Sequence, residues 1–272
     1  MPELPEVETT RRGVAPHMVG QRIRELKIHE HRLRWPVSRH LPARVAGLRI
    51  LAVSRRAKYL LFGLEGDLTL LWHLGMSGNL RVLPESAPRR SHDHIDLVLA
   101  SGETLRFNDP RRFGSLHCID GEPAKHPLLR ELGPEPLETP FDADYLWRAT
   151  RHRRVAIKQL VMNAKVVVGV GNIYASEALF RAGIRPGRRA GNLRREEITR
   201  LVVAIREVLS MAIEVGGTTL RDYVGADGAP GYFRQKLFVY ERAGETCRCC
   251  KTIVRQRVQG QRSTYWCPSC QA

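Results

Sequence analysis

The stretch CRCCKTIVRQRVQGQRSTYWCPSC, residues 247–270, holds five of the six cysteines in this 272-residue chain. It contains two C-x-x-C pairs separated by sixteen residues. This spacing is typical of a tetrahedral four-thiolate zinc ribbon, in which two strands and a turn lie between the pairs. Four protein sulfurs leave no open position for water, so we expect one structural zinc ion. The expected ligands are Cys247, Cys250, Cys267 and Cys270.

Cys249 is the spare thiol of this segment and can serve as an alternative ligand, whereas Cys118 stands alone far upstream. Such clustering suits a local metal clip better than a disulfide framework. The hairpin between the pairs also carries Arg255, Arg257 and Arg262. These arginines can reach a phosphate backbone, or they can form a solvated basic face.

The whole chain carries an excess of positive charge. Its 44 Lys and Arg residues against 28 Asp and Glu give a formal charge of +16. This field favours an acidic polymer as partner over an ordinary enzyme with a basic surface. The sequence has no N-terminal signal segment, and its apolar runs are too short to cross a bilayer. We therefore expect a cytoplasmic protein that does not insert into membranes.

Upstream of the ribbon, the first half of the chain reads as β-structure. Short apolar runs are broken by turn residues at 65–67, 101–102 and 108–110, which predicts an antiparallel sandwich or barrel. The passage 132–147 follows, and its three prolines predict a linker.

The period of the apolar residues then changes to that of helices. Three-four spacing from Ile198 to Ile213 predicts an amphipathic helix, with Asn192 as N-cap and a stop at Gly216. A shorter helix is predicted over 156–162. Another is predicted from Asn172, which we expect to be its N-cap.

The turn before Asn172 is rich in glycine, with Gly169 and Gly171 leading into the helix. The free N–H groups and positive dipole end of such a helix can bind phosphate. Glycines of this kind also occur for backbone reasons alone. The basic run 151–154 and Lys158 nearby make DNA backbone binding the better interpretation.

Two expected loops carry apolar side chains beside arginine. Met76 lies in HLGMSG, and Arg111 and Phe113 lie in NDPRRFG. A lone Met or Phe in a turn usually packs inward. On a basic protein, such residues can instead enter a base stack as wedges.

The N-terminal stretch MPELPEVETTRRG predicts a helix that begins at Pro5 and stops at Gly13. Pro2 and Glu3 then lie just before the helix. If Met1 is removed, Pro2 carries a terminal secondary amine, and N-terminal amines titrate at about 7.7–8.0 in model peptides. Such an amine can attack a sugar carbon and form an iminium. Taken alone, the stretch is better explained as a well-capped helix start.

Ten blocks in order along the chain together resemble the bacterial formamidopyrimidine-DNA glycosylases. They are MPELPEVET, RRAKYLL, HLGMSG, HDHIDLV, DPRRFG, LGPEPL, VGVGNIYASE, GGTTLRDYV, GYF and the cysteine ribbon. The resemblance implies an α+β multidomain fold. Its parts are an N-terminal β-sandwich domain over residues 1–132, a linker and helix-two-turn-helix domain over 133–236, and a zinc-ribbon finger over 237–272.

The resemblance also implies an activity on double-stranded DNA that contains oxidised bases or abasic sites. It further implies a bacterial protein that associates with the nucleoid through DNA and needs no second subunit. The family excises oxidised purines, including 8-oxoguanine and formamidopyrimidines, and then cleaves the abasic site by β,δ-elimination. Enzymes of this kind extrude the target nucleotide, at a cost of a few kcal/mol of unstacking. The segment Thr218–Tyr232 corresponds to the part of the family that closes over the extruded base.

Four residues match the catalytic residues of the family. Pro2 matches the nucleophile that attacks C1′, and Glu3 matches the acid that assists sugar-ring opening. Lys58, in the expected RRAKYLL strand, matches the proton donor of β-elimination. Arg262 matches the donor assigned to δ-elimination, although a guanidinium is better suited to clamping phosphate. The matched DNA contacts are Met76, His92, Arg111, Phe113, Arg153, Lys158 and Asn172.

Two alternatives stay open at the level of sequence. Endonuclease VIII-like glycosylases share the Pro-Glu start, the helical domain and the ribbon, but prefer oxidised pyrimidines. Leu4, Val7 and the LGPEPL and GYF blocks favour the purine-specific branch. A non-enzymatic zinc-ribbon DNA-binding protein would explain the charge and the cysteines, but it gives no reason to combine Pro2-Glu3 with Lys58 and Arg262.

Overall fold

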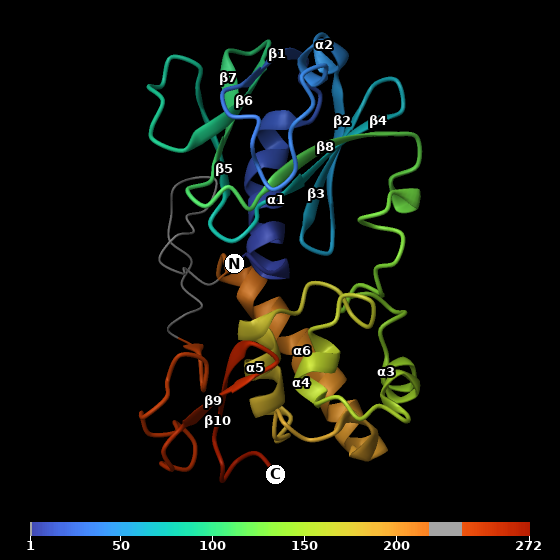
Figure 1. Ribbon diagram of the computed structural model, residues 1–272, viewed down its shortest axis with the longest axis vertical. Coiled ribbons are helices and arrows are strands. Elements are labelled where there is room, and N and C mark those ends of the chain that lie inside the picture. Colours follow the sequence, from blue (N-terminus) through green and yellow to red (C-terminus); the bar gives the residue numbers. More distant parts are fainter. Residues whose placement is uncertain (1, 218–235) are drawn as a thin grey trace. The chain divides into compact units, whose positions relative to one another are not determined.

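The computed structural model describes residues 2–217 and 236–272, and the chain divides into two compact units. The described part of the first unit spans residues 2–130 and 215–217, and that of the second spans 131–214 and 236–272. Figure 1 labels β1–β8 in the first unit and α3–α6 in the second. Met1 and the segment Thr218–Tyr232, expected to close over a base, lie outside the described residues.

The first unit is built from two four-stranded antiparallel sheets and one long helix. The sheet orders are β1-β6-β7-β5 and β2-β3-β4-β8. The strands are β1 (Ile23–Ile28), β2 (Ile50–Arg56), β3 (Tyr59–Leu64), β4 (Leu68–His73), β5 (Asn79–Pro84), β6 (Asp93–Leu99), β7 (Glu103–Asn108) and β8 (Ser115–Asp120). The helices are α1 (Leu4–Met18), α2 (Leu41–Val45) and the 3-10 turn η1 (Pro123–Lys125).

Both sheets bury one face in a common core, which decides for the sandwich over the barrel. Strand β3 alternates as the sequence predicts, because Leu60 and Phe62 are buried while their neighbours are partly exposed. The Trp72 ring of one sheet lies 5.5 Å from the Phe107 ring of the other, measured between ring centroids. The predicted turns at 65–67, 101–102 and 108–110 all follow strand ends.

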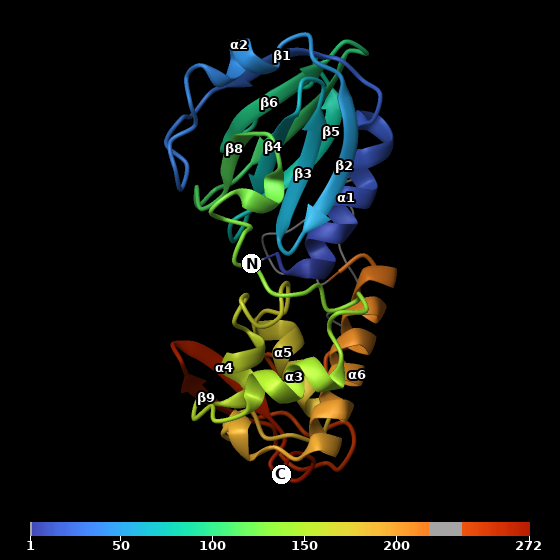
Figure 2. The same ribbon diagram turned by 90° about the vertical axis from the view of Figure 1, so that its right-hand side faces the viewer.

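Helix α1 closes one side of the sandwich, where it contacts the edge strands β2 and β5 (Figure 2). The expected stop at Gly13 is wrong, because the helix begins at Leu4 and continues to Met18. Val14 and Met18 are fully buried. Their burial outweighs the cost of about 1 kcal/mol for a glycine inside a helix.

The second unit combines a helical part with the cysteine ribbon. Its elements are α3 (Ala143–Thr150), α4 (Ile157–Val161), α5 (Asn172–Arg181), the 3-10 turn η2 (Ala190–Asn192), α6 (Arg195–Glu214), β9 (Arg255–Gln259) and β10 (Arg262–Trp266). All eight apolar positions from Ile198 to Ile213 that predicted α6 are buried. Helix α6 packs against α3 and α5, and α5 also contacts β10.

Three local expectations in this unit are wrong. Asn192 ends η2 instead of capping α6; the Arg194 N–H, just before α6, donates to the Glu197 carboxylate at 2.7 Å. Gly171 is the N-cap of α5, so Asn172 is its first helical residue. The expected linker contains the start of α3, where Asp142 accepts a hydrogen bond from the Tyr145 N–H at 2.6 Å.

Among the described residues, no helix combines the length and the apolar character that a membrane-spanning segment requires.

Candidate functional site

The four predicted ligand cysteines come together in the second unit. The sulfurs of Cys247, Cys250, Cys267 and Cys270 all lie within 4.8 Å of one another. The Cys247–Cys270 and Cys250–Cys267 sulfur pairs are 3.9 Å and 3.4 Å apart. Tetrahedral bonds of about 2.3 Å to zinc place sulfurs about 3.8 Å apart, so the cluster can hold such an ion. Cys249 is exposed and outside the cluster.

Backbone groups support two of these sulfurs. The Cys249 N–H donates to the Cys247 sulfur, and the Cys270 N–H donates to the Cys267 sulfur, both at 3.4 Å. Such N–H donors stabilise thiolates, because they offset the negative charge. The strands β9 and β10 pair between the cysteine pairs, as the sequence predicts. The turn is Gly260-Gln261, one residue later than the Gln259-Gly260 turn expected from the sequence, because Gln259 still pairs with Arg262.

A buried lysine ties the ribbon to the helical part of its unit. Lys158 is 1% exposed, and its Nζ contacts Asn172 Oδ1 at 2.6 Å, the Ser263 carbonyl at 3.0 Å and Thr264 Oγ1 at 2.9 Å. The Asn172 amide also donates to the Ser263 carbonyl at 3.0 Å. All three ammonium protons are thus used inside the protein. A direct phosphate contact by Lys158 would have to replace one of these bonds.

Two of the cations predicted to contact DNA are exposed in this unit. Arg262 is exposed and directly precedes Ser263 at the start of β10. Arg153 is exposed in a turn, where its carbonyl accepts a hydrogen bond from the Gly191 N–H at 2.9 Å. Hydrogen bonds thus fix the backbone at or next to both residues: the Ser263 carbonyl after Arg262 and the carbonyl of Arg153 itself.

In the first unit, Pro2 and Glu3 are buried at the start of α1. The Glu3 N–H donates to Glu6 Oε2 at 2.9 Å, which caps the helix. The backbone of residues 2–3 is therefore fixed at the positive end of the helix dipole.

Lys58 lies in the turn between β2 and β3, so its expected place inside a strand is wrong. The turn forms because Ala57 adopts a positive φ of 54°. Arg55 connects this turn to α1: it donates to the Ala57 carbonyl at 2.9 Å and to Glu8 Oε2 at 3.3 Å. One partly buried ion pair thus links the helix that carries Pro2 to the turn that carries Lys58.

His73, at the end of β4, is a residue that the sequence patterns did not single out. Burial, together with the positive charges of Lys58 and Arg34, lowers the pKa of His73 to about 4. The ring is therefore neutral near pH 7. Its Nδ1 accepts the Gly75 N–H at 3.0 Å, which leaves the proton on Nε2. The signal in the sequence was a histidine directly before LGMSG.

Asp109 was also missed, and it joins the two loops predicted to carry wedge residues. It is fully buried. Its carboxylate accepts hydrogen bonds from Ser77 Oγ and the Gly114 N–H, both at 2.8 Å, and from the Arg111 N–H at 3.3 Å. The loop after β4 and the loop after β7 are thus held by one carboxylate.

The same loops pack backbone against backbone. A methyl group on Gly75 would overlap the Gly114 amide and the Phe113 carbonyl carbon, and φ at Gly75 is +69°. Only glycine meets both requirements. Phe113 stays 43% exposed, and the Arg111 guanidinium lies 4.9 Å from its ring centroid. Met76 is half-buried between the loops' ends.

His92 is exposed and reaches the same group of loops. Its carbonyl accepts the Asp109 N–H at 3.1 Å, and its φ is 70°. The first unit therefore gathers Met76, His92, Arg111 and Phe113 around Asp109, and the second gathers Lys158, Asn172 and Arg262 around the ribbon.

The β-sandwich, the helical part and the four-cysteine ribbon define the class of fold as an α+β multidomain protein with a candidate metal ribbon, and comparison with known proteins gives the family. The N-terminal domain model of formamidopyrimidine-DNA glycosylase matches residues 1–116, and its H2TH domain model matches residues 132–224. The chain belongs to the formamidopyrimidine-DNA glycosylase family. This confirms the resemblance and the fold class predicted from the sequence.

Individual relatives agree over their full lengths. The formamidopyrimidine-DNA glycosylases of Thioalkalivibrio sulfidiphilus and Stutzerimonas stutzeri are 62% and 55% identical to this chain, with complete coverage of both chains. The crystal structure of the MutM (Fpg) protein from Thermus thermophilus is 44% identical, with a TM-score of 0.89 over 99% of this chain and 98% of that one. The Lactococcus lactis Fpg in complex with DNA containing an abasic site is 33% identical, with a TM-score of 0.92 over 99% of both chains.

Proposed function

We propose that this protein removes oxidised purines from double-stranded DNA and then cleaves the abasic site by β,δ-elimination. One observation carries the assignment of roles. Pro2 and Glu3 are fixed at the start of α1, and the Glu8–Arg55 pair joins that helix to the Lys58 turn. The residues that would supply an amine, a carboxylate and an ammonium thus lie on two segments, α1 and the Lys58 turn, that Arg55 connects. The relatives of this chain are formamidopyrimidine-DNA glycosylases.

The chemistry follows from these groups. The Pro2 nitrogen attacks C1′ as the bond to the damaged base breaks, and Glu3 assists opening of the sugar ring. The resulting iminium acidifies the C2′ proton, so its removal expels the 3′ phosphate. A second elimination, after loss of the C4′ proton, expels the 5′ phosphate. Lys58 is the proposed proton donor of the first elimination, and Arg262 is proposed to hold phosphate during the second.

The extruded base leaves a gap that the wedge residues are proposed to fill. Met76, Arg111 and Phe113 project from loops that share the Asp109 carboxylate. A wedge must be stiff to offset a few kcal/mol of unstacking. His92, Arg153 and Asn172 are proposed phosphate contacts. Lys158 is proposed to act by orienting Asn172 and the ribbon, because its own donors are used internally.

Zinc is the proposed occupant of the four-cysteine cluster, since four thiolates in tetrahedral reach are its usual structural site. Bound there, it would fix the hairpin that carries Arg262. One zinc ion per chain by elemental mass spectrometry is the expected result. Another metal at full occupancy would overturn the assignment.

Borohydride trapping tests the catalytic proposal. We expect a covalent complex with a duplex containing 8-oxoguanine opposite cytosine. Extending the chain by one residue before Pro2 should abolish it, because an amide nitrogen cannot attack C1′. Active protein should therefore lack Met1, and intact Met1 in fully active material would contradict this. Trapping only with oxidised pyrimidines would favour an endonuclease VIII-like activity, and no trapping with any lesion would leave only DNA binding.

A further inference from the structure

The segment between β5 and β6, residues 85–92, crosses the outer face of its sheet. Strand β5 ends at Pro84, which pairs with Glu103 at one end of β7. Strand β6 begins at Asp93, which pairs with Asn108 at the other end of β7. The connection must therefore run the length of the sheet. All seven residues of β6 are buried, and three of them, Ile95, Leu97 and Leu99, lie in the core of the sandwich.

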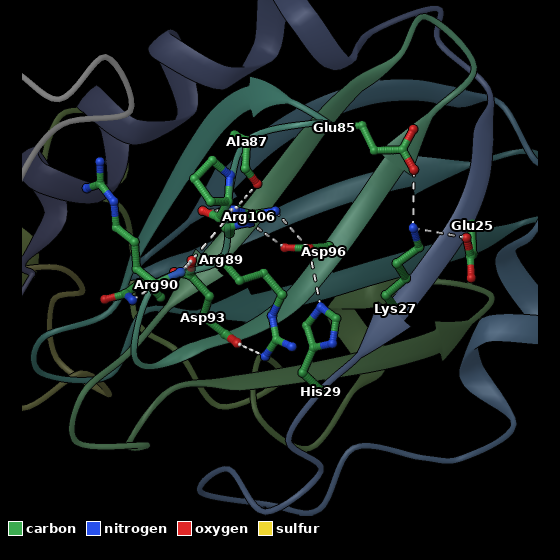
Figure 3. A network of polar contacts seen from close by, with 12 residues as sticks. Glu25, Lys27, His29, Glu85, Ala87, Arg89, Arg90, Asp93, Asp96 and Arg106 are labelled. Carbon is green, nitrogen blue, oxygen red and sulfur yellow. Dashed lines mark hydrogen bonds and ion pairs between the residues drawn. The ribbon is translucent and has the colours of Figure 1, made fainter.

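A buried arginine anchors the crossing segment (Figure 3). Arg106 faces away from the core and is only 2% exposed. Its Nε and Nη2 donate to the two carboxylate oxygens of Asp96 at 2.8 Å and 3.1 Å. Its Nη1 donates to the carbonyls of Ala87 and Pro88, both at 3.0 Å. All three guanidinium nitrogens are thus used to hold the segment on the sheet.

Asp93 fixes the end of the segment as a tight turn. Its Oδ2 accepts the Arg90 N–H at 2.7 Å, and its own N–H donates to the Arg90 carbonyl at 3.2 Å. Its Oδ1 accepts hydrogen bonds from Arg81 at 2.9 Å and from Asn108 at 2.8 Å. His92 completes the turn with its positive φ of 70°.

This turn lies at the end of the sheet that carries the wedge loops. The Asp109 N–H donates to the His92 carbonyl, and Asp109 holds the loop with Arg111 and Phe113. The turn also carries two exposed arginines, Arg89 and Arg90. They therefore stand beside residues already proposed to contact DNA.

The two arginines differ in how they are held. Arg89 Nη2 donates to the Asp93 carbonyl at 3.1 Å, which orients its guanidinium. The Arg90 guanidinium donates to no residue within the described ranges, and Figure 3 shows this side chain extending away from the cluster. Buried ion pairs such as Arg106–Asp96 add little stability over apolar residues of similar size. We therefore assign to Arg106 and Asp93 the fixing of the position of the 89–92 turn.

We propose that Arg89 and Arg90 form a further contact to DNA phosphates, on a turn that Arg106 and Asp93 hold beside the wedge loops. This inference rests on the proposed function, because it needs DNA bound at that end of the sandwich. Arginine suits the role, since its planar fork binds phosphate oxygens in pairs. Neither residue was among the contacts expected from the sequence.

The test measures how the affinity for lesion DNA depends on salt. The double variant Arg89→Gln with Arg90→Gln removes two charges from the turn. The control, Arg22→Gln with Arg49→Gln, removes two charges at the opposite end of the unit, where both arginines pair with Glu65. All proteins bind the same duplex containing a stable abasic-site analogue. Fluorescence anisotropy from about 50 to 200 mM KCl gives each Kd.

We expect the log Kd against log salt slope to become shallower by about 0.9 for each phosphate that is no longer neutralised, hence by about 1.8 in the turn variant. The Kd at low salt should rise about tenfold, and the control should stay within about twofold of wild type. If the two double variants show equal slopes, the change in slope reflects only the loss of net charge, and the inference is overturned. Absence of lesion binding by the wild-type protein would instead overturn the proposed function, and the inference with it.

Discussion

The sandwich and the ribbon solve the same structural problem in different ways. Each presents exposed cationic or apolar side chains on short loops that have to be stiff. In the first unit, the buried Asp109 carboxylate and close-packed glycines hold the wedge loops. In the second, four cysteines and Lys158 hold the hairpin that carries Arg262. The contacts that hold the sandwich loops come from the chain itself, whereas we expect the ribbon to depend on an added ion.

Metal removal should have the largest effect, because a two-stranded hairpin is at best marginally stable alone. Chelation is expected to abolish protection from hydrogen exchange over residues 236–272 and to abolish DNA cleavage. Peptides from β2–β8 should keep their protection. The metal-loaded protein kept in the same buffer is the control. If β9 and β10 keep their protection after chelation, the ribbon does not depend on the metal, and the contrast with the sandwich is wrong.

Substitution of Asp109 tests the sandwich side of the comparison. Asp109→Ala leaves the Ser77 hydroxyl and the Gly114 N–H buried without an acceptor, so we expect a loss of about 3–5 kcal/mol in the free energy of unfolding. Urea denaturation measures it. Asp120→Ala is the control, because that exposed carboxylate forms only a surface pair with Arg44 and should cost less than about 1 kcal/mol. Equal losses in the two variants would mean that Asp109 does not organise the loops.

The comparison also separates what the sequence could predict from what it could not. Cysteine spacing and the apolar period of α6 are local patterns, so the ribbon and that helix were predicted correctly. The stop at Gly13 failed because tertiary burial of Val14 and Met18 carries α1 past the glycine. The Asn172 cap failed because its side chain serves Lys158 and Ser263, which are distant in sequence.

The candidate site shows the same division. Motif blocks located Pro2, the cysteines and the wedge residues, but they could not reveal the buried polar groups that hold them. In the sequence, Asp109 is only one residue of a predicted turn. Its role becomes visible only in the fold, where Ser77 Oγ and the Gly114 N–H donate hydrogen bonds to its carboxylate. Likewise, the sequence shows Arg106 only as a polar residue on the outer face of a strand. In the fold, it donates hydrogen bonds to the carbonyls of residues 87–88.

Lys158 tests whether the ribbon depends on the metal alone. Lys158→Met keeps the length of the side chain but leaves Asn172 Oδ1 and Thr264 Oγ1 without the Lys158 donor, and it leaves the Ser263 carbonyl with the Asn172 amide as donor. We therefore expect a loss of about 3 kcal/mol in the second unit. The metal should stay bound. Lys165→Met is the control, because Lys165 is exposed and forms a surface pair with exposed Glu131. Hydrogen exchange of β10 measures both, and unchanged exchange in Lys158→Met would assign the hairpin's order to the metal alone.

The smallest expected effect concerns His73 and the pH dependence of the sandwich. The pKa of His73 is about 4 in the folded protein, against the usual value of 6.5. The unfolded chain therefore binds more protons between these values, so His73 stabilises the fold fully above about pH 6.5, and this contribution declines as the pH falls toward 4. A shift of this size corresponds to at most about 3 kcal/mol.

The difference in unfolding free energy between wild type and His73→Gln should shrink by that amount between pH 7 and pH 4, measured by urea denaturation. Since the second unit has no part in this term, the change should follow the unfolding of the sandwich. A difference that stays constant with pH would show that His73 is not held neutral beside Lys58.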